Sequence, residues 1–235
     1  MKLYFAGSFS GVKAPRLKEL GVQNKLFSYA NEKNSAIEWG SNGLMLDSGA
    51  FSVFTKGIEV NIDSLIAFIK EHKPEAAIQL DVIGDDEKTW SNYRYMREHV
   101  PNVLPVIHYK ASDEHIKRVV EATDYILLGG LVPLTRQKPK LFAWLDYLYA
   151  NYGLRHKKIH LLGITTKTVL ERYPAYSCDS SSALSINRYP ASDPLIRMKQ
   201  KTEHYTDLYK YGIDEMMNLE TYITKLWEKR GIIWQ

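Results

Sequence analysis

Short apolar runs alternate with longer amphipathic segments along most of this chain. Eight of the runs have the length and the aliphatic content of buried β-strands. They lie at residues 3–7, 26–30, 44–47, 76–83, 103–108, 125–129, 158–164 and 175–179. Helical patterns occupy 62–73, 85–99, 112–122, 138–152 and 166–173, and a short helix fits within 11–21. After a polar loop at 180–194, two further helices are predicted at 195–211 and 214–230.

Strands that alternate with helices predict a parallel sheet with helical crossovers. Eight such strands indicate an α/β protein with a (β/α)8 TIM barrel, in a single domain over residues 1–235 with helices at its C-terminus. A chain of 235 residues is close to the minimum for this fold, which typically fills about 250 residues. An open, doubly wound sheet is the alternative topology.

Five of the apolar runs end in polar residues or glycines. In a (β/α)8 barrel the C-terminal ends of the strands carry the reactive groups. The residues expected at this rim are Asp47-Ser48-Gly49, Asp81, His108, Gly129-Gly130 and Asp179. A lone aspartate at a strand end often caps the next helix, and Asp47 and Asp81 each allow that interpretation. Three carboxylates on different strands, with a Gly-Gly pair on a fourth, favour an enzyme.

Composition narrows the class of protein further. The single cysteine, Cys178, excludes an intramolecular disulfide and a Cys-rich zinc site, and it fits a reducing cytoplasm. No apolar stretch approaches the roughly 20 residues that a membrane helix needs. The formal net charge of +4 allows a polyanionic partner without requiring one.

Two residues near these motifs favour structural roles. His160 lies near the start of its predicted strand, so we place it at the opposite rim with a structural role. Strand alternation directs Cys178 away from the side of Asp179, which favours a buried thiol over a nucleophile. For His108 the structural and functional interpretations are evenly balanced.

The motifs occur in an order that resembles the tRNA-guanine transglycosylase superfamily, whose members fold as (β/α)8 barrels. The resemblance covers about residues 44–182. It is carried by Asp47-Ser48-Gly49-Ala50-Phe51, Leu80-Asp81, Gly129-Gly130-Leu131, His160-Leu161-Leu162-Gly163-Ile164 and Cys178-Asp179.

The resemblance implies base exchange, in which a guanine of a nucleic acid is replaced by a free 7-deazaguanine base without a cofactor. Asp179 is then the nucleophile that attacks the sugar C1′, and Asp47 handles protons on the departing and incoming base. Asp81 binds the edge of the base that carries the amino group and the ring N–H, and the backbone N–H of Gly130 donates a hydrogen bond to the base carbonyl. The remaining residues expected at the base are Ser48, Gly49, Phe51, His108, Gly129 and Leu131. Phe51 or Tyr109 is expected to sandwich the unstacked base.

The chain departs from the family pattern in three places. The family's Cys-x-Cys-x-x-Cys…His zinc site is absent, because one cysteine cannot form it. His108 stands where family members have a glutamine, and Ala50 and Ser52 replace a glycine and a glutamine. A short form without zinc most resembles the phage and bacterial branch that modifies DNA. DNA is therefore the favoured partner and tRNA the alternative. The expected compartment is the cytoplasm, which is that of the host if a phage encodes the protein. The protein could also form a homo-oligomer.

Two other functions are compatible with the pattern. Asp47, Asp81, His108 and Asp179 could be the ligands of a metal-dependent hydrolase. Alternatively, the barrel binds nucleic acid or modified bases without cutting a bond. Chelator sensitivity identifies the first alternative, and salt-dependent binding without turnover identifies the second.

Overall fold

Nine parallel strand segments form a single sheet in a computed structural model that describes residues 1–9, 12–183 and 205–234. Their order across the sheet is β5-β4-β3-β2-β1-β9-β8-β7-β6. The segments are β1 (Lys2–Ala6), β2 (Lys25–Ser28), β3 (Leu44–Asp47), β4 (Ala76–Ile78), β5 (Val103–Leu104), β6 (Val106–His108), β7 (Tyr125–Gly129), β8 (Lys158–Leu161) and β9 (Ser177–Ser180).

The sheet closes into a barrel through its two outermost segments. Only Pro105 separates β5, which pairs with β4, from β6, which pairs with β7. Proline has no N–H for a strand ladder, but the Pro105 carbonyl accepts a 3.0 Å hydrogen bond from the Leu127 N–H. If β5 and β6 are counted as one interrupted strand, the sheet has the eight strands of a (β/α)8 barrel. The predicted barrel is therefore confirmed, and the alternative topology, an open doubly wound sheet, is wrong.

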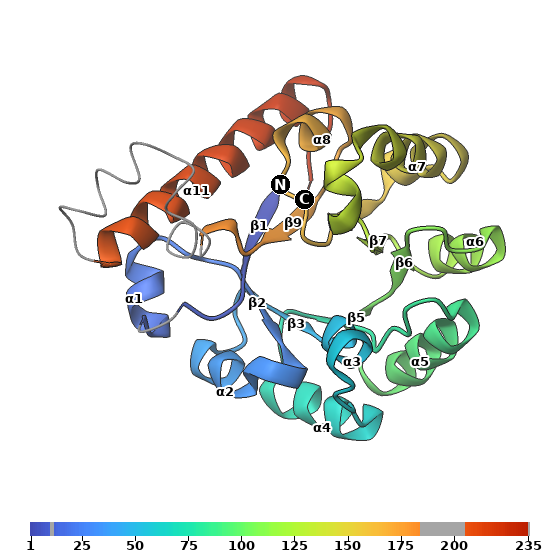
Figure 1. Ribbon diagram of the computed structural model, residues 1–235, viewed down its shortest axis with the longest axis horizontal. Helices are drawn as coiled ribbons and strands as arrows, with labels where there is room; N and C mark the ends of the chain where they lie inside the picture. The colour runs from blue at the N-terminus through green and yellow to red at the C-terminus, as the bar shows by residue number, and fades with distance from the viewer. Residues whose placement is uncertain (10–11, 184–204, 235) are drawn as a thin grey trace.

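Helices surround the strands, as Figure 1 shows. They are α1 (Ala14–Glu19), α2 (Tyr29–Trp39), α3 (Ala50–Lys56), α4 (Ile62–His72), α5 (Asp86–His99), α6 (Asp113–Ala122), α7 (Lys138–Asn151), α8 (Lys167–Arg172) and α11 (Tyr205–Lys229), with 3-10 turns η1 (Val132–Arg136) and η2 (Leu154–His156). Side-chain oxygens of Asn61, Asp85 and Ser112 cap α4, α5 and α6 by accepting backbone N–H groups three residues ahead. None of the helices in the described part of the chain is long and apolar enough to span a bilayer.

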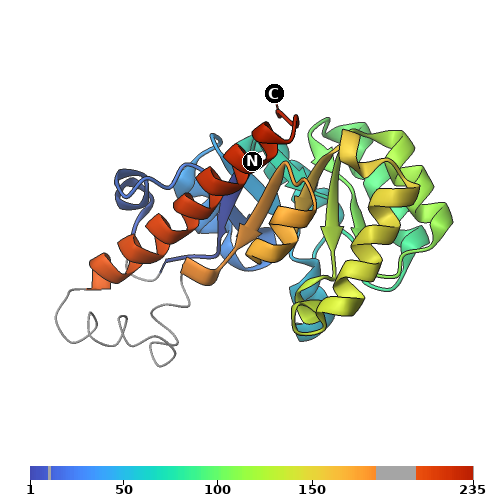
Figure 2. The same ribbon diagram turned by 90° about the horizontal axis from the view of Figure 1, so that it is seen from above.

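The C-terminal helix differs from its prediction. The expected break at residues 212–213 is wrong, because α11 runs without interruption from Tyr205 to Lys229 beside β1 and α8 (Figure 2). Ile213, Met216, Ile223 and Trp227 are buried and recur at helical spacing, so a continuous apolar face extends across Gly212. Residues 195–204 of the predicted helix, and 184–194 of the predicted loop, lie outside the described residues.

The helices α2 and α3 were not predicted. Strand β2 was expected to continue to Ala30, but α2 begins at Tyr29. Only Tyr29, Ala36 and Trp39 of α2 are buried, so the helix has little apolar periodicity to reveal it.

The core has an inner and an outer part. Inside the barrel lie Tyr4, Leu26, Met45, Ala76, Ile78, Leu104, Val106 and Leu127, and a larger cluster packs between strands and helices. Cys178 belongs to the outer cluster and is fully buried, so the predicted buried thiol is confirmed. Burial raises the pKa of this thiol well above its usual value.

Lys25 is a fully buried lysine in β2. Its ammonium donates to the Gly7 carbonyl and lies 4.6 Å and 4.5 Å from the ring centroids of Phe9 and Phe27. Burial lowers the pKa of Lys25 to about 7, although Glu32 opposes the shift. Since the unfolded chain binds this proton more tightly, the burial cost is greatest below pH 7 and disappears as the pH approaches 10.5.

We therefore expect Lys25→Met to raise the free energy of unfolding at pH 6 by about 1–3 kcal/mol, and to change it little at pH 10. Urea denaturation at the two pH values measures the difference. Destabilisation by Lys25→Met at pH 6 would show instead that the contacts of the ammonium outweigh its burial cost.

Candidate active site

A cavity of about 530 Å³ opens at the C-terminal ends of the barrel strands. Its lining residues come from most of the strands and the loops that follow them: Leu26, Asp47, Ala50, Phe51, Ile78, Asp81, Ile83, His108, Gly129, Gly130, Val132, Pro133, Leu162, Gly163 and Asp179. Seven of the predicted site residues thus meet in one cavity. The size suits a small-molecule or nucleotide site.

Asp179 lies in β9 with only 7% of its surface exposed. One carboxylate oxygen, Oδ1, accepts two hydrogen bonds, at 2.8 Å from the backbone N–H of Gly163 and at 3.1 Å from Nε2 of His160. Gly163 has a φ of +69°, and a Cβ there would lie 2.5 Å from Cγ2 of Val132, so glycine is required to bring this N–H to the carboxylate. The site therefore holds Asp179 by one oxygen.

The placement of His160 corrects the sequence analysis. Its expected position at the opposite rim is wrong, because its side chain lies under the cavity and is hydrogen-bonded to Asp179. The strand was predicted to continue to residue 164, whereas β8 ends at Leu161. His160 is therefore one residue from the C-terminal end of its strand, and its ring is fully buried.

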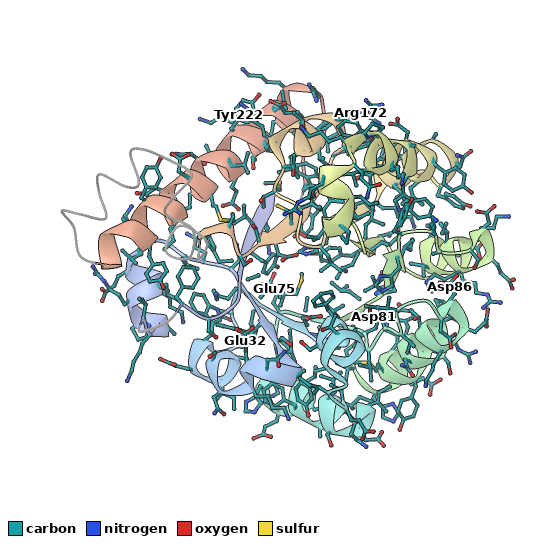
Figure 3. The ribbon with its side chains drawn as sticks, viewed as in Figure 1. Glu32, Glu75, Asp81, Asp86, Arg172 and Tyr222 are labelled. Carbon is teal, nitrogen blue, oxygen red and sulfur yellow. The ribbon has the colours of Figure 1, made fainter. Side chains whose placement is uncertain are left out.

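Asp81 and His108 form a second pair in the cavity. Nε2 of His108 lies 2.5 Å from Oδ2 of Asp81, and Asp81 is 8% exposed. Figure 3 labels Asp81 on the inner side of the ring of helices, whereas Arg172 and Tyr222 lie at its outer edge. A paired carboxylate and imidazole can accept and donate hydrogen bonds along the edge of a heterocyclic base.

The Gly-Gly pair has a packing role that the sequence did not reveal. A Cβ on Gly129 would lie 2.9 Å from Cγ1 of Val106 and 3.0 Å from Nδ1 of His108. Gly130 has a φ of +69°, which favours glycine. Both glycines line the cavity, and Gly129 also makes room for the His108 ring. Base binding by the Gly130 amide stays a prediction.

Asp47 ends β3 and faces the two other carboxylates. Burial, followed by the nearby charge of Asp81, raises the pKa of Asp47 to about 7. Asp179 and Glu32 act in the same direction, and a hydrogen bond from the Gly49 N–H opposes them. Near neutral pH this carboxyl is partly protonated, so it can both give and take a proton.

Three predicted residues do not line the cavity. Leu131 is fully buried in the outer core, and Gly49 supports Asp47 through its N–H. Ser48 is fully buried, and its Oγ has no hydrogen-bond partner among the described residues. Gly49 itself sits where a Cβ would lie 2.4 Å from Cβ of Ala30, so close packing explains this glycine.

The aromatic side chain at the cavity mouth is Phe51, which is 71% exposed in α3. Tyr109, the other expected stacking residue, packs instead against the outer core, with its ring centroid 5.6 Å from that of Trp144. Val132, 53% exposed, lies on the cavity wall together with Pro133. These exposed apolar groups suit the face of a planar ring.

The cavity wall is largely apolar and its charged groups are acidic. Asp47, Asp81 and Asp179 line it, whereas no Lys or Arg is among the lining residues in the part of the chain that the structure describes. Within residues 1–9, 12–183 and 205–234, no group of three or more His, Cys, Asp or Glu has the arrangement of a metal site. Asp81 and Asp179 are each hydrogen-bonded to a histidine side chain, His108 and His160 respectively.

No family model matches this chain. It is similar to a protein of Sulfolobus islandicus rod-shaped virus 1 that is described as uncharacterized protein 306. The two are 24% identical over 161 residues, which cover 64% of this chain. The chain spans about half the length of this viral relative, 52% of which is covered. The comparison therefore supplies a viral relative whose description names no activity.

Proposed function

We propose that the protein is a base-exchange transglycosylase that replaces guanine in a nucleic acid, with DNA favoured over tRNA, by a 7-deazaguanine. The observation that carries this proposal is the meeting of three carboxylates with different surroundings in one cavity. Asp179 is held at one oxygen by two donors, Asp81 is paired with His108, and Asp47 has a pKa of about 7. Different environments give carboxylates different roles.

The first half-reaction uses Asp179 and Asp47. A carboxylate oxygen of Asp179 bonds to C1′ of the sugar as the bond from C1′ to N9 of guanine breaks. The electron pair of that bond stays on the base, and protonated Asp47 supplies a proton to it. An ionised carboxylate stabilises the positive charge that develops on the sugar, and the covalent ester conserves the glycosidic bond energy.

The second half-reaction reverses these roles. Asp47, now ionised, takes the N9 proton of the incoming 7-deazaguanine, whose nitrogen bonds to C1′ as the ester to Asp179 breaks. Two displacements at one centre retain the configuration of the sugar. A carboxyl with a pKa near the working pH suits this alternation, because both of its states are populated.

The base must leave the stack to reach a cavity among strand ends. Phe51, Val132 and Pro133 provide apolar surface for its face at the mouth, while Asp81 and His108 offer polar groups for its edge. Free nucleobases carry no phosphate, so a cavity lined by carboxylates does not repel them. The lack of a Cys-rich zinc motif supports DNA, because the family associates that motif with tRNA enzymes.

Asp81→Ala is expected to weaken the binding of free guanine by about 10- to 100-fold, because a charge-assisted hydrogen bond contributes about 1.5–3 kcal/mol. The rate of the sugar chemistry at saturating base should change less. Isothermal titration calorimetry with guanine measures the affinity. Asp86→Asn is the control, because Asp86 begins α5 outside the cavity lining and an amide oxygen can still accept its hydrogen bond from the Ser112 N–H. Unchanged affinity for Asp81→Ala would overturn the recognition role.

Incorporation of radiolabelled guanine into double-stranded DNA and, separately, into tRNA tests the proposed function. We expect label in DNA that requires Asp179 and is unaffected by EDTA. Label in tRNA alone would keep the reaction and reverse the preferred polymer. Salt-sensitive binding without label in either polymer would contradict the proposal in favour of a non-catalytic barrel, and EDTA-sensitive hydrolysis would favour the metal-dependent alternative.

A further inference from the structure

A buried hydrogen-bond chain runs from Asp179 into the interior of the barrel. Nε2 of His160 lies 3.1 Å from Oδ1 of Asp179, and Nδ1 of the same ring lies 2.7 Å from Oγ of Ser177. Oγ of Ser177 in turn lies 2.7 Å from the hydroxyl of Tyr125. The four residues come from the three neighbouring strands β7, β8 and β9.

The surroundings of this chain are apolar. His160 and Ser177 are fully buried, and the ring of Tyr4 meets the imidazole edge-on at a centroid distance of 5.8 Å. Leu127 is the register partner of His160 on β7 and belongs to the inner core. Aliphatic side chains fill the rest of the interior, so packing alone does not require an imidazole and a hydroxyl here.

With Asp179 ionised and the His160 ring neutral, one direction is consistent for every bond in the chain. An ionised carboxylate can only accept, so Nε2 of His160 carries a hydrogen and donates to Asp179. In the neutral ring Nδ1 then accepts from the hydroxyl of Ser177, whose oxygen accepts from the hydroxyl of Tyr125. Such a chain fixes both the tautomer and the orientation of the imidazole, as outer partners do for other active-site histidines.

Both donors to Asp179 reach the same oxygen. The Gly163 N–H and His160 Nε2 converge on Oδ1, and no hydrogen bond to Oδ2 occurs among the described residues. Two fixed donors at one oxygen restrict rotation of the carboxylate about its χ2 angle. Because Asp179 also lines the cavity, its second oxygen is the one available to a reacting carbon.

We propose that His160, held by Ser177 and Tyr125, is a positioning residue that occupies Oδ1 of Asp179 and leaves Oδ2 to attack C1′. This inference rests on the base exchange proposed above. The chain Tyr125–Ser177–His160 orients the nucleophile before substrate arrives, which lowers the cost of reaching the attack geometry. His160 does not itself touch the sugar or the base.

The kinetic test compares His160→Leu with His160→Gln, whose amide can again donate to the carboxylate. We expect His160→Leu to lower kcat for guanine incorporation by about 10- to 100-fold with KM for guanine within twofold. His160→Gln should recover most of that loss, and Ser177→Ala and Tyr125→Phe should give smaller losses in kcat alone. An unchanged kcat for His160→Leu, in a wild type that exchanges, overturns the inference and leaves the proposed function standing.

A spectroscopic test needs no activity. In protein labelled with 15N-histidine, the His160 ring should carry its hydrogen on Nε2 only, assigned by the loss of its signals in His160→Gln. Ser177→Ala should leave the hydrogen on Nε2, because the Asp179 carboxylate still accepts from it, whereas Asp179→Ala should remove the preference for Nε2–H. A ring that already carries hydrogen on Nδ1 alone in the wild type overturns the inference, whereas a wild type that shows the expected tautomer but no exchange overturns the proposed function.

Discussion

Asp179→Asn is expected to lower the rate of guanine exchange by about 10⁴-fold or more, because it removes the proposed nucleophile while keeping an oxygen at the same place. The amide oxygen can still accept from Gly163 and His160, so the barrel should unfold at nearly the wild-type denaturant concentration. Asp179→Ala should abolish exchange as well. It leaves two inward-facing donors without a partner, at a cost of about 1–3 kcal/mol each.

Single-turnover incorporation of label at saturating guanine measures the loss in rate. Asp124→Asn is the matched control, because it removes a carboxylate that is exposed and lies immediately before β7, at the end of the barrel away from the cavity. Near-wild-type turnover of Asp179→Asn would refute the assignment of the nucleophile. A loss of equal size in Asp124→Asn would show that the effect is not local.

Asp47→Asn is expected to slow exchange by about 10²- to 10⁴-fold, the usual contribution of a general acid or base. It should also stabilise the protein at high pH. The pKa of Asp47 is about 7 in the folded protein against 3.8 for an ordinary aspartate, so the folded state binds this proton more tightly than the unfolded state. Stability associated with Asp47 is therefore present below pH 4 and is lost as the pH rises from about 4 to 7.

The expected gain for Asp47→Asn at pH 8 is at most about 4 kcal/mol, because a shift of one pKa unit corresponds to about 1.4 kcal/mol. Urea denaturation at pH 4.5 and pH 8 measures it, with the larger gain at pH 8. Asp146→Asn is the control of opposite sign, since hydrogen bonds from Tyr173 and Arg172 lower the pKa of Asp146. A loss of stability for Asp47→Asn at pH 8 would contradict the conclusion that the ionised Asp47 carboxylate destabilises the folded protein.

The apolar runs in the sequence were sufficient to predict the barrel and the rim. All eight predicted strands are present, and Asp47, Asp81, His108 and Asp179 meet in one cavity. The limits of these strands were less well predicted. Residues 79–83 follow β4 as a loop, because Asp81 turns back with its N–H bonded to the Gln79 carbonyl.

The contact of His160 with Asp179 could not be predicted from spacing along the chain. Its partners Ser177 and Asp179 follow it by 17 and 19 residues and reach it only across the pairing of β8 with β9. Placing the end of the strand three residues too late also assigned His160 to the wrong end of the barrel. The adjacent motif Leu162-Gly163 was the available signal, because a glycine directly after a strand marks its C-terminal end.

The central claim, a covalent bond between Asp179 and a sugar, can be tested by trapping. The protein would be incubated with double-stranded DNA, quenched in acid and denaturant, and examined by intact-mass spectrometry and peptide mapping. The account predicts an adduct of protein with DNA that has lost one guanine, attached to the peptide containing Asp179, discharged by added guanine and absent in Asp179→Asn. Guanine exchange that proceeds without an adduct at Asp179, or an adduct that persists in Asp179→Asn, would contradict it.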